Sequence, residues 1–455
     1  MKLRRTLLAV MAVLCVMAML LTACGNQPAG GDNGNTGNNP PAGNTGNDNN
    51  PPAGNTGSDN NSPAGGDAEP VTLTYWYWAD NDTYAAKMEE IIADFNATNE
   101  YGITVVGEQQ NWDGGGYSTT LQTACLGGGG PDMATFKLTA TPTFVENDLL
   151  YDLTGMVAAW DGSGDISDNL WNTMKYASNT DNIYVMPWNI QVLYVYYRPS
   201  YFEAAGASVP TNYTEFLDAI KTISEANLTN DAGEKVYGFG MRGNSGGQEP
   251  WGSFIYANGG SFEDLASAGA VAGMQDFIDL YTNGYVPANS TEVGFAEMKA
   301  DFLGGRTAMM VHHCASSLEM METFGDDVGA FIFPASDKGQ WTSLGDTENV
   351  VMSSTKNPEA AFEFMKYMAA GKGEEMWCEA TGNVPVSERV QAMDFVQSNP
   401  FLQISIGGID VAGILPCNPT TSEFISAWPN IIAQGLEGTK TAEQVCGELQ
   451  ALLWP

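Results

Sequence analysis

The segment from Gly25 to Pro70 contains no aromatic residue and no Val, Leu, Ile or Met. Such a composition cannot bury enough apolar surface to offset the entropy lost on ordering. Residues 40–50 recur as residues 51–61 with one change, and a repeat without an apolar face cannot stack into a solenoid. Packed structure is therefore expected only in residues 71–455, a body too long for one hydrophobic core and long enough for two.

The residues before this segment read as a secretory leader. Basic residues at positions 2, 4 and 5 precede an apolar run over residues 7–21, which ends at Leu-Thr-Ala and then Cys24. The run is shorter than the roughly 20 residues that span a bilayer. The Leu-Thr-Ala-Cys sequence resembles the bacterial lipobox, which implies a signal peptide over residues 1–23 and a lipid on the Cys24 thiol. Residues 24–70 would then tether the body to the outer face of the cytoplasmic membrane.

The charge balance is strongly acidic. Without residues 1–23 the chain keeps 15 Lys and Arg against 54 Asp and Glu. This sign argues against nucleic acid as a partner and favours a neutral or cationic ligand. Acidic surfaces are also common among exported proteins, so solubility alone explains the charge equally well.

Strands alternate with helices at the start of the body, which predicts an α/β fold with a parallel sheet. The expected elements are strand 71–78, helix 84–96, strand 103–106, helix 117–126 and strand 133–136. Ligands on such sheets bind beyond the carboxyl ends of the strands. The residues expected near that edge are Trp78, Asp80, Asn81, Trp112 and Phe136.

Several short motifs follow one another in the order of a known family. They are Gly-Gly-Pro-Asp-Met at 129–133, Ile-Tyr-Val-Met-Pro-Trp-Asn at 183–189, the apolar run 193–198, Phe-Leu-Gly-Gly-Arg-Thr-Ala-Met at 302–309, Ser-Thr-Lys-Asn-Pro-Glu-Ala-Ala at 354–361 and Gly-Asn-Val-Pro at 382–385. In this order the body resembles the bacterial extracellular solute-binding proteins, the sugar-binding class of ABC-transporter receptors. Arg198 stands where the family usually has Asn, which puts the local role of that position in doubt.

The resemblance implies a two-lobed, periplasmic-binding-protein-like fold of type II, with a hinge and a ligand cleft between the lobes. Lobe 1 would comprise about residues 71–186 and 345–385, and lobe 2 about residues 187–344 and 386–455. The implied function is capture of a carbohydrate, an oligosaccharide, and its delivery to an ABC import permease. The resemblance implies a monomer without a cofactor.

Sugars present C–H faces to aromatic rings and hydroxyl groups to polar side chains. The resemblance places further candidates in the cleft: Trp188, Asn189, Trp251, His312, Trp341 and Asp346. Each Trp has core packing as its alternative role, and each acidic residue that follows a strand has helix capping. Trp377 and Trp454 lie on expected helices and are expected in the core.

Metal and catalytic sites find little support in the sequence. The five cysteines of the body have no zinc-ligand spacing, and adjacent histidines at 312 and 313 point to opposite faces of a strand. No motif of a hydrolase or nucleotide-binding enzyme occurs, so a binding protein rather than an enzyme is expected. Two alternatives stay open, a receptor for a non-sugar solute and a surface carbohydrate-active enzyme.

Overall fold

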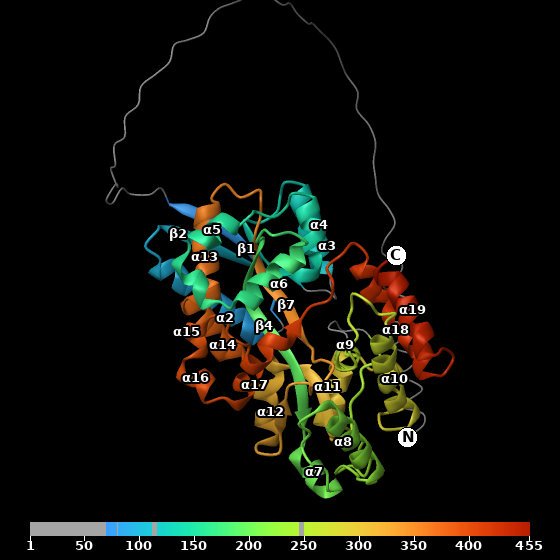
Figure 1. Ribbon diagram of the computed structural model, residues 1–455. Coiled ribbons are helices and arrows are strands. Elements are labelled where there is room, and N and C mark those ends of the chain that lie inside the picture. Colours follow the sequence, from blue (N-terminus) through green and yellow to red (C-terminus); the bar gives the residue numbers. More distant parts are fainter. Residues whose placement is uncertain (1–69, 80, 112–115, 245–249) are drawn as a thin grey trace, which may run out of the picture. The chain divides into compact units, whose positions relative to one another are not determined.

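The computed structural model describes residues 70–79, 81–111, 116–244 and 250–455, and of Asp346 only the backbone (Figure 1). The strands are β1 (Val71–Tyr77), β2 (Ile103–Gln109), β3 (Met133–Lys137), β4 (Val185–Tyr197), β5 (Met309–His313), β6 (Gly329–Phe331), β7 (Thr342–Val351) and β8 (Ala412–Gly413). Among these residues no helix is both long and apolar enough to cross a membrane.

The helices of the first half are α2 (Asp82–Thr98), α3 (Gly116–Leu126), α4 (Thr141–Glu146), α5 (Thr154–Ala159), α6 (Asp168–Ser178), α7 (Pro199–Ala205), α8 (Tyr213–Glu225), α9 (Gly252–Ala257) and α10 (Ala268–Thr282). Those of the second half are α11 (Phe295–Leu303), α12 (Ser317–Phe324), α13 (Pro358–Ala370), α14 (Lys372–Thr381), α15 (Glu388–Gln391), α16 (Asp394–Gln397), α17 (Pro400–Gly408), α18 (Thr421–Leu436) and α19 (Ala442–Leu453).

The expected start of the body is confirmed. Strand β1 pairs in parallel with β2 on one side and with β3 on the other. Its buried residues Leu73, Tyr75 and Tyr77 alternate with more exposed ones, as a strand with one face on a core requires. Helix α2 begins after Asn81, whose side chain accepts a hydrogen bond from the backbone N–H of Tyr84 at 2.9 Å.

A half-buried carboxylate fixes the start of β3 beside β1. Asp132 Oδ2 accepts hydrogen bonds from the Thr74 N–H at 2.8 Å and from the Thr74 hydroxyl at 3.0 Å. Its Oδ1 accepts a third bond, at 2.7 Å, from the hydroxyl of Thr355. The Pro-Asp motif is thus structural, because Asp132 ties the start of β3 to a neighbouring strand and to the loop that precedes α13.

Two long strands connect the remaining parts of the sheet. Strand β7 runs antiparallel between β3 and β4. The first part of β4 pairs with β7 up to Val192, and from Leu193 onward β4 pairs with β5 and β6. Figure 1 shows β4 extending from the region of β1 and α2 toward the region of α7, α8 and α12.

The apolar residues form two core clusters. The first core cluster surrounds β1–β3 and includes Phe364 and Met365 of α13. The second core cluster joins α8, α9, α10, α18 and α19. Side chains of β4 alternate between them, because Leu193 and Val195 enter the second cluster whereas Tyr194 and Tyr196 enter the first. The first cluster also takes in residues of the expected second lobe: Phe302, Met310 and Phe401.

No disulfide bond joins any two of the described cysteines. Cys314, Cys378, Cys417 and Cys446 are buried, and Cys125 is half-buried. Burial raises the pKa of the Cys314 thiol to about 11. These cysteines therefore act as small apolar residues rather than as reactive thiols.

A buried glutamate fixes the segment that follows α14. Glu374 is fully buried, and its Oε1 accepts hydrogen bonds from the N–H groups of Val386 at 2.6 Å and Ser387 at 2.9 Å. Its Oε2 contacts the hydroxyl of Ser387. Burial raises the pKa of Glu374 to about 8, although the contacts with Ser387 and Val386 and the charge of Arg389 act in the opposite direction.

This raised pKa predicts a pH-dependent stability. Between about pH 4.5 and pH 8 the folded chain keeps a proton that the unfolded chain has lost, so the free energy of unfolding falls as pH rises. Glu374→Gln can keep all three hydrogen bonds without titrating, and it should remove a few kcal/mol of that fall. Denaturant titrations at several pH values, with the exposed Glu388→Gln as control, measure the difference. Parallel pH profiles for wild type and Glu374→Gln would contradict the prediction.

Candidate functional site

The carboxyl edge of the parallel strands carries an aromatic ring and a cation. Trp78 directly follows β1, is 8% exposed and packs edge-to-face on Tyr117, with ring centroids 4.8 Å apart. Lys137 ends β3, and its Nζ lies 5.7 Å from the centroid of the Trp78 ring. The same Nζ donates a hydrogen bond to Thr347 Oγ1 of β7 at 2.9 Å. The strand order β2-β1-β3 makes this edge the topological switch point, as the sequence analysis expects for ligand binding.

A bulge in β4 places Trp188 beside this edge. The pairing of β4 with β7 shifts register between Met186 and Asn189, so β4 accommodates one extra residue there. The backbone N–H of Trp188 donates to the carboxylate of the fully buried Glu348. Asn189 then pairs with Thr347, the residue that Lys137 contacts. The bulge therefore brings Trp188 and Asn189 of β4 close to Lys137 at the end of β3.

Two residues that the sequence analysis did not assign to the site complete an aromatic series. The Trp188 and Trp377 rings lie 5.0 Å apart, and Trp377 lies 5.8 Å from Tyr84. The Trp377 indole N–H donates a long hydrogen bond of 3.4 Å to Asn189 Oδ1. The expected burial of Trp377 is confirmed, whereas Trp454 is 40% exposed and the expectation for it was wrong. The Gly-Asn-Val-Pro motif was the sequence signal that could have pointed to Trp377. Its Val384 pairs with Ile190, and this bridge holds the end of α14 beside β4.

Several buried polar atoms in this region are not hydrogen-bonded. Within the described part of the chain, Trp188 Nε1, Asn349 Nδ2 and Asn383 Oδ1 have no hydrogen-bond partner. Asn349 Oδ1, by contrast, accepts from the hydroxyl of Tyr75 at 2.7 Å. Buried polar atoms are nearly always paired with protein, water or ligand. In this conformation all three atoms are closed off from solvent, so a ligand would reach them only where the surrounding side chains move apart.

The end of β5 adds two neutral histidines. His312 is buried, with Nδ1 3.0 Å from the Ser316 hydroxyl, and His313 stacks on Phe295 with centroids 5.2 Å apart. Burial, followed by the positive charges of Lys299, Arg242 and Lys137, lowers the pKa of His313 to about 3. His313 is half-buried, whereas His312, the residue predicted for the site, is fully buried.

The other predicted site residues have the contacts of structural residues. Asn81 caps α2, and Phe136 packs edge-to-face on Phe144 with centroids 5.0 Å apart. Trp251 is fully buried in the second core cluster against Phe262, 5.4 Å away. Trp341 stacks on Tyr256 at 5.3 Å. A ligand-binding role for these four stays a prediction without support from their contacts.

Part of the prediction lies outside what the structure describes. Asp80, Trp112 and the lipidation residue Cys24 are not among the described residues, and the side chain of Asp346 is not described. Among described residues no group of three or more His, Cys, Asp or Glu could hold a metal ion. The described site thus consists of Trp78, Tyr84, Lys137, Trp188, Asn189, His313, Thr347, Glu348, Asn349, Trp377 and Asn383. We call this set the strand-crossing site.

Comparison with known proteins gives one family. The family model described as bacterial extracellular solute-binding protein matches residues 90–403, which include the motifs from 129 to 385. A curated relative, the diacetylchitobiose binding protein DasA of Streptomyces coelicolor, is 24% identical over 400 residues, which are 84% of this chain and 90% of the relative. The proteins of this family bind solutes and are not enzymes, as the sequence analysis expects.

Solved structures confirm the fold. MalE of Xanthomonas citri, described as a sugar-binding protein, has a TM-score of 0.72 and 17% identity, covering 84% of this chain and 96% of its own. The GacH receptor of Streptomyces glaucescens, solved unliganded and with acarbose, has a TM-score of 0.70 and 21% identity, covering 85% and 99%. An ABC-transporter solute-binding protein of Thermotoga lettingae, bound with α-D-tagatose, has a TM-score of 0.69 and 23% identity, covering 84% and 100%.

The burial of Trp377 in the strand-crossing site predicts that removing its side chain destabilises the fold. Trp377→Ala should lower the free energy of unfolding by about 3–5 kcal/mol, because a buried indole leaves a cavity between Trp188 and Tyr84. Trp454→Ala is a matched control on an exposed indole and should cost much less. Guanidinium titrations measure both variants. Equal losses would contradict the burial difference between the two residues.

Proposed function

This chain belongs to the bacterial extracellular solute-binding protein family, and on that premise we propose that it captures a carbohydrate and delivers it to the permease of an ABC transporter. The observation that carries the proposal is the strand-crossing site. There Trp78, Trp188 and Trp377, all members of the first core cluster, lie with amide, carboxylate and ammonium groups near the pairing of β4 with β7. Aromatic rings fit the C–H faces of a sugar, and the polar groups fit its edge.

An oligosaccharide rather than a single sugar is proposed as the ligand. The curated relative is described as binding diacetylchitobiose, and the GacH receptor was solved with acarbose. These two descriptions support a ligand of two or more sugar units.

Capture is proposed to proceed by closure of two lobes about β4 and β7. Lobe 1 comprises about residues 71–186 and 345–385, and lobe 2 about residues 187–344 and 386–455. Because β4 and β7 serve both parts of the sheet, small backbone changes in them can move one lobe against the other. The ligand shifts the population toward the closed form only as far as it binds that form better.

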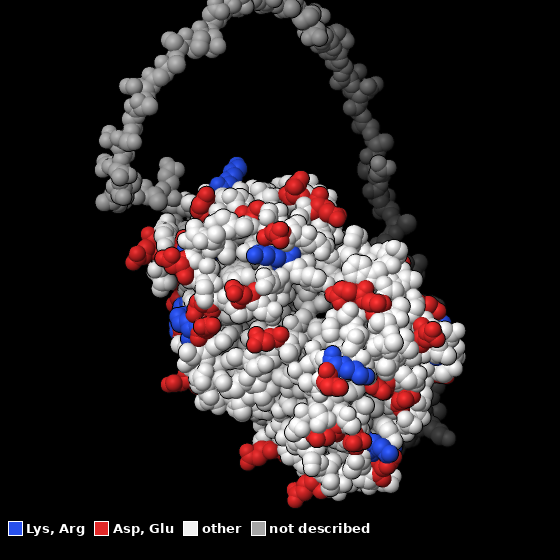
Figure 2. Space-filling view, viewed as in Figure 1, with Lys and Arg blue, Asp and Glu red and all other residues white. Residues whose placement is uncertain are grey.

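The location follows from the leader. We propose that Cys24 carries a lipid and that residues 24–70 tether the body, as a monomer, outside the cytoplasmic membrane. A flexible linker of about 45 residues reaches roughly 35–40 Å. Such a tether keeps the receptor near its permease. Figure 2 shows acidic side chains scattered over the visible face with few basic ones between them, which suits an exposed, soluble body.

A glycan panel tests the carbohydrate proposal. At a concentration about 100-fold above Kd the cognate sugar should raise the free energy of unfolding by about 2.7 kcal/mol, because it binds only the folded chain. Thermal shift and tryptophan emission of the Cys24→Ser chain measure this effect. A response to an amino acid, peptide or metal, and to no saccharide, would overturn the proposal.

A lysine variant tests the position of the site. Lys137→Met removes the cation beside Trp78 and should weaken binding of the responding sugar at least tenfold, since a hydrogen bond from a charged group is lost. Lys221→Met, on an exposed position of α8, is the control and should leave Kd unchanged. Titration calorimetry measures both. Unchanged affinity in Lys137→Met would show that the sugar binds at a site that does not include Lys137.

Membrane fractionation tests the anchor. Wild-type chain should remain with the membrane and incorporate labelled palmitate, whereas Cys24→Ser should do neither. Cys125→Ser controls for loss of a cysteine as such. Retention of Cys24→Ser in the membrane fraction would show that something other than this thiol holds the chain.

A further inference from the structure

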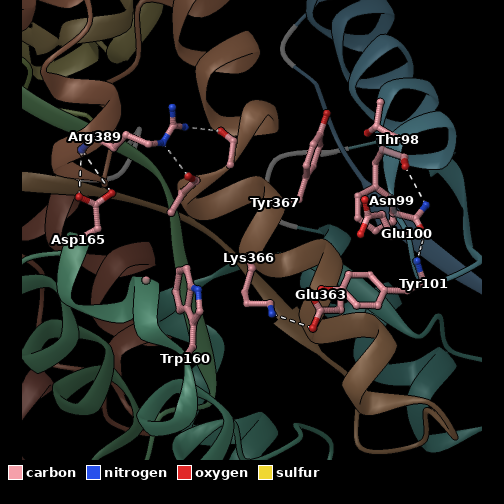
Figure 3. A pocket seen from close by; sticks show the side chains of 14 residues that line it. Thr98, Asn99, Glu100, Tyr101, Trp160, Asp165, Glu363, Lys366, Tyr367 and Arg389 are labelled. Carbon is pink, nitrogen blue, oxygen red and sulfur yellow. Dashed lines mark hydrogen bonds and ion pairs between the residues drawn. The ribbon is translucent and has the colours of Figure 1, made fainter. Parts of the chain in front are cut away.

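A cavity opens at the opposite edge of the parallel strands. It has a volume of about 750 Å³ and is bordered by the end of α2, the 3-10 turn Asp161–Asp165, one face of α13, and Arg389 (Figure 3). Its rim residue Tyr101 precedes Gly102, whose carbonyl accepts a hydrogen bond from Val71 at the first residue of β1. Trp78 follows the other end of this strand, so about 20 Å separate the two sites. The volume is within the range of small-ligand pockets.

Aromatic rings line this cavity. Tyr101 is 55% exposed, and Trp160 is half-buried with its ring perpendicular to Phe362. A Cβ atom at Gly162 would come within 2.6 Å of Trp160 Nε1, so glycine at this position lets the indole lie against the turn. The Tyr367 hydroxyl donates to Asp94 Oδ2 at 2.6 Å. Trp160 and Tyr367 are thus held in place before any ligand arrives.

Polar groups lie between the rings. Lys366 and Glu363 form an ion pair of 2.7 Å on α13. Figure 3 shows this pair between Trp160 and Tyr101, with the Tyr101 ring directed toward Glu363. On the far side, Asp165 accepts a hydrogen bond from the backbone N–H of Arg389 at 3.1 Å. Donors and acceptors therefore alternate with rings around the cavity.

The charges argue against an ionic ligand. Lys366 is already paired with Glu363, and the Arg389 guanidinium donates to the carbonyls of Ala370 and Gly371 at the end of α13. Helices α2 and α13 both end here, and helix carboxyl ends disfavour anions. A compact cation would compete with Lys366 and Arg389. A neutral molecule with apolar faces and hydroxyl edges fits these constraints best.

We infer that this cavity is a second saccharide-binding site, distinct from the strand-crossing site, for one or two sugar units of a glycan. Tyr101 and Trp160 stack on the sugar faces, and Glu363, Lys366 and Asp165 bind its hydroxyl groups. The site sits where β1 begins and shares none of the residues of the strand-crossing site. It holds the body against a glycan while the other site is free to take its own ligand.

The test compares aromatic variants of the Cys24→Ser chain. Maltotetraose and diacetylchitobiose are titrated to tens of millimolar, with equilibrium dialysis for stoichiometry and Trp emission as readout. Wild type should bind a second, millimolar-range equivalent of at least one of them. In the Tyr101→Ala/Trp160→Ala chain the affinity for that second equivalent should fall at least tenfold. Tyr101→Ala alone, at an exposed position, should lower this affinity by a smaller factor. Thermal melts establish that each variant is folded.

Controls separate this inference from the transport proposal. Lys137→Met should keep the weak equivalent, and Trp454→Ala should change neither equivalent. A single equivalent in wild type, or a weak equivalent that Tyr101→Ala/Trp160→Ala leaves intact, would overturn the second site without touching the first. Loss of the tight equivalent in Lys137→Met with an unchanged weak one supports both assignments.

Discussion

The antiparallel pairing of β4 with β7 is the interaction on which the rest of the structure depends. Strand β7 pairs with β3 of the parallel part, while β4 continues from β7 to β5 and β6. Side chains of β4 accordingly enter both core clusters. Strand β5 is shared in the same way, because Met310 enters the first cluster whereas Met309 and Val311 enter the second. The two cores therefore meet along β4 and the strands that pair with it.

Several of the proposed binding residues lie close to an irregularity in this pairing. A regular ladder would continue past Met186 with its side chains alternating between faces. The bulge instead turns the Trp188 N–H to the buried Glu348 and brings the Trp188 ring to Trp377. A fully buried carboxylate is costly unless it is hydrogen-bonded. The Glu348 carboxylate accepts a hydrogen bond from the Trp188 N–H. This bond stabilises the bulged backbone of β4 where the regular ladder is interrupted.

Local sequence patterns predicted the start of the fold and little of the site. Alternating and helical spacing identified β1 to β3 and the helices between them, because these signals depend only on neighbouring residues. The contact of Trp188 with Trp377 depends instead on the return of α14 through Val384 to β4, which no local pattern encodes. Trp251, predicted as a cleft residue from its polar neighbours, lies in the second core because α9 packs it against α18. Polar neighbours in the sequence do not determine whether a side chain points into the core or toward solvent.

Hydrogen exchange of the chain with and without its responding saccharide tests most directly whether ligand is held at the crossing of β4 and β7. The account predicts added protection of backbone amides around Trp78, Lys137, Trp188 and His313, that is, in both halves of the body at once. Protection confined to one half, or located only around Tyr101 and Trp160, would contradict it.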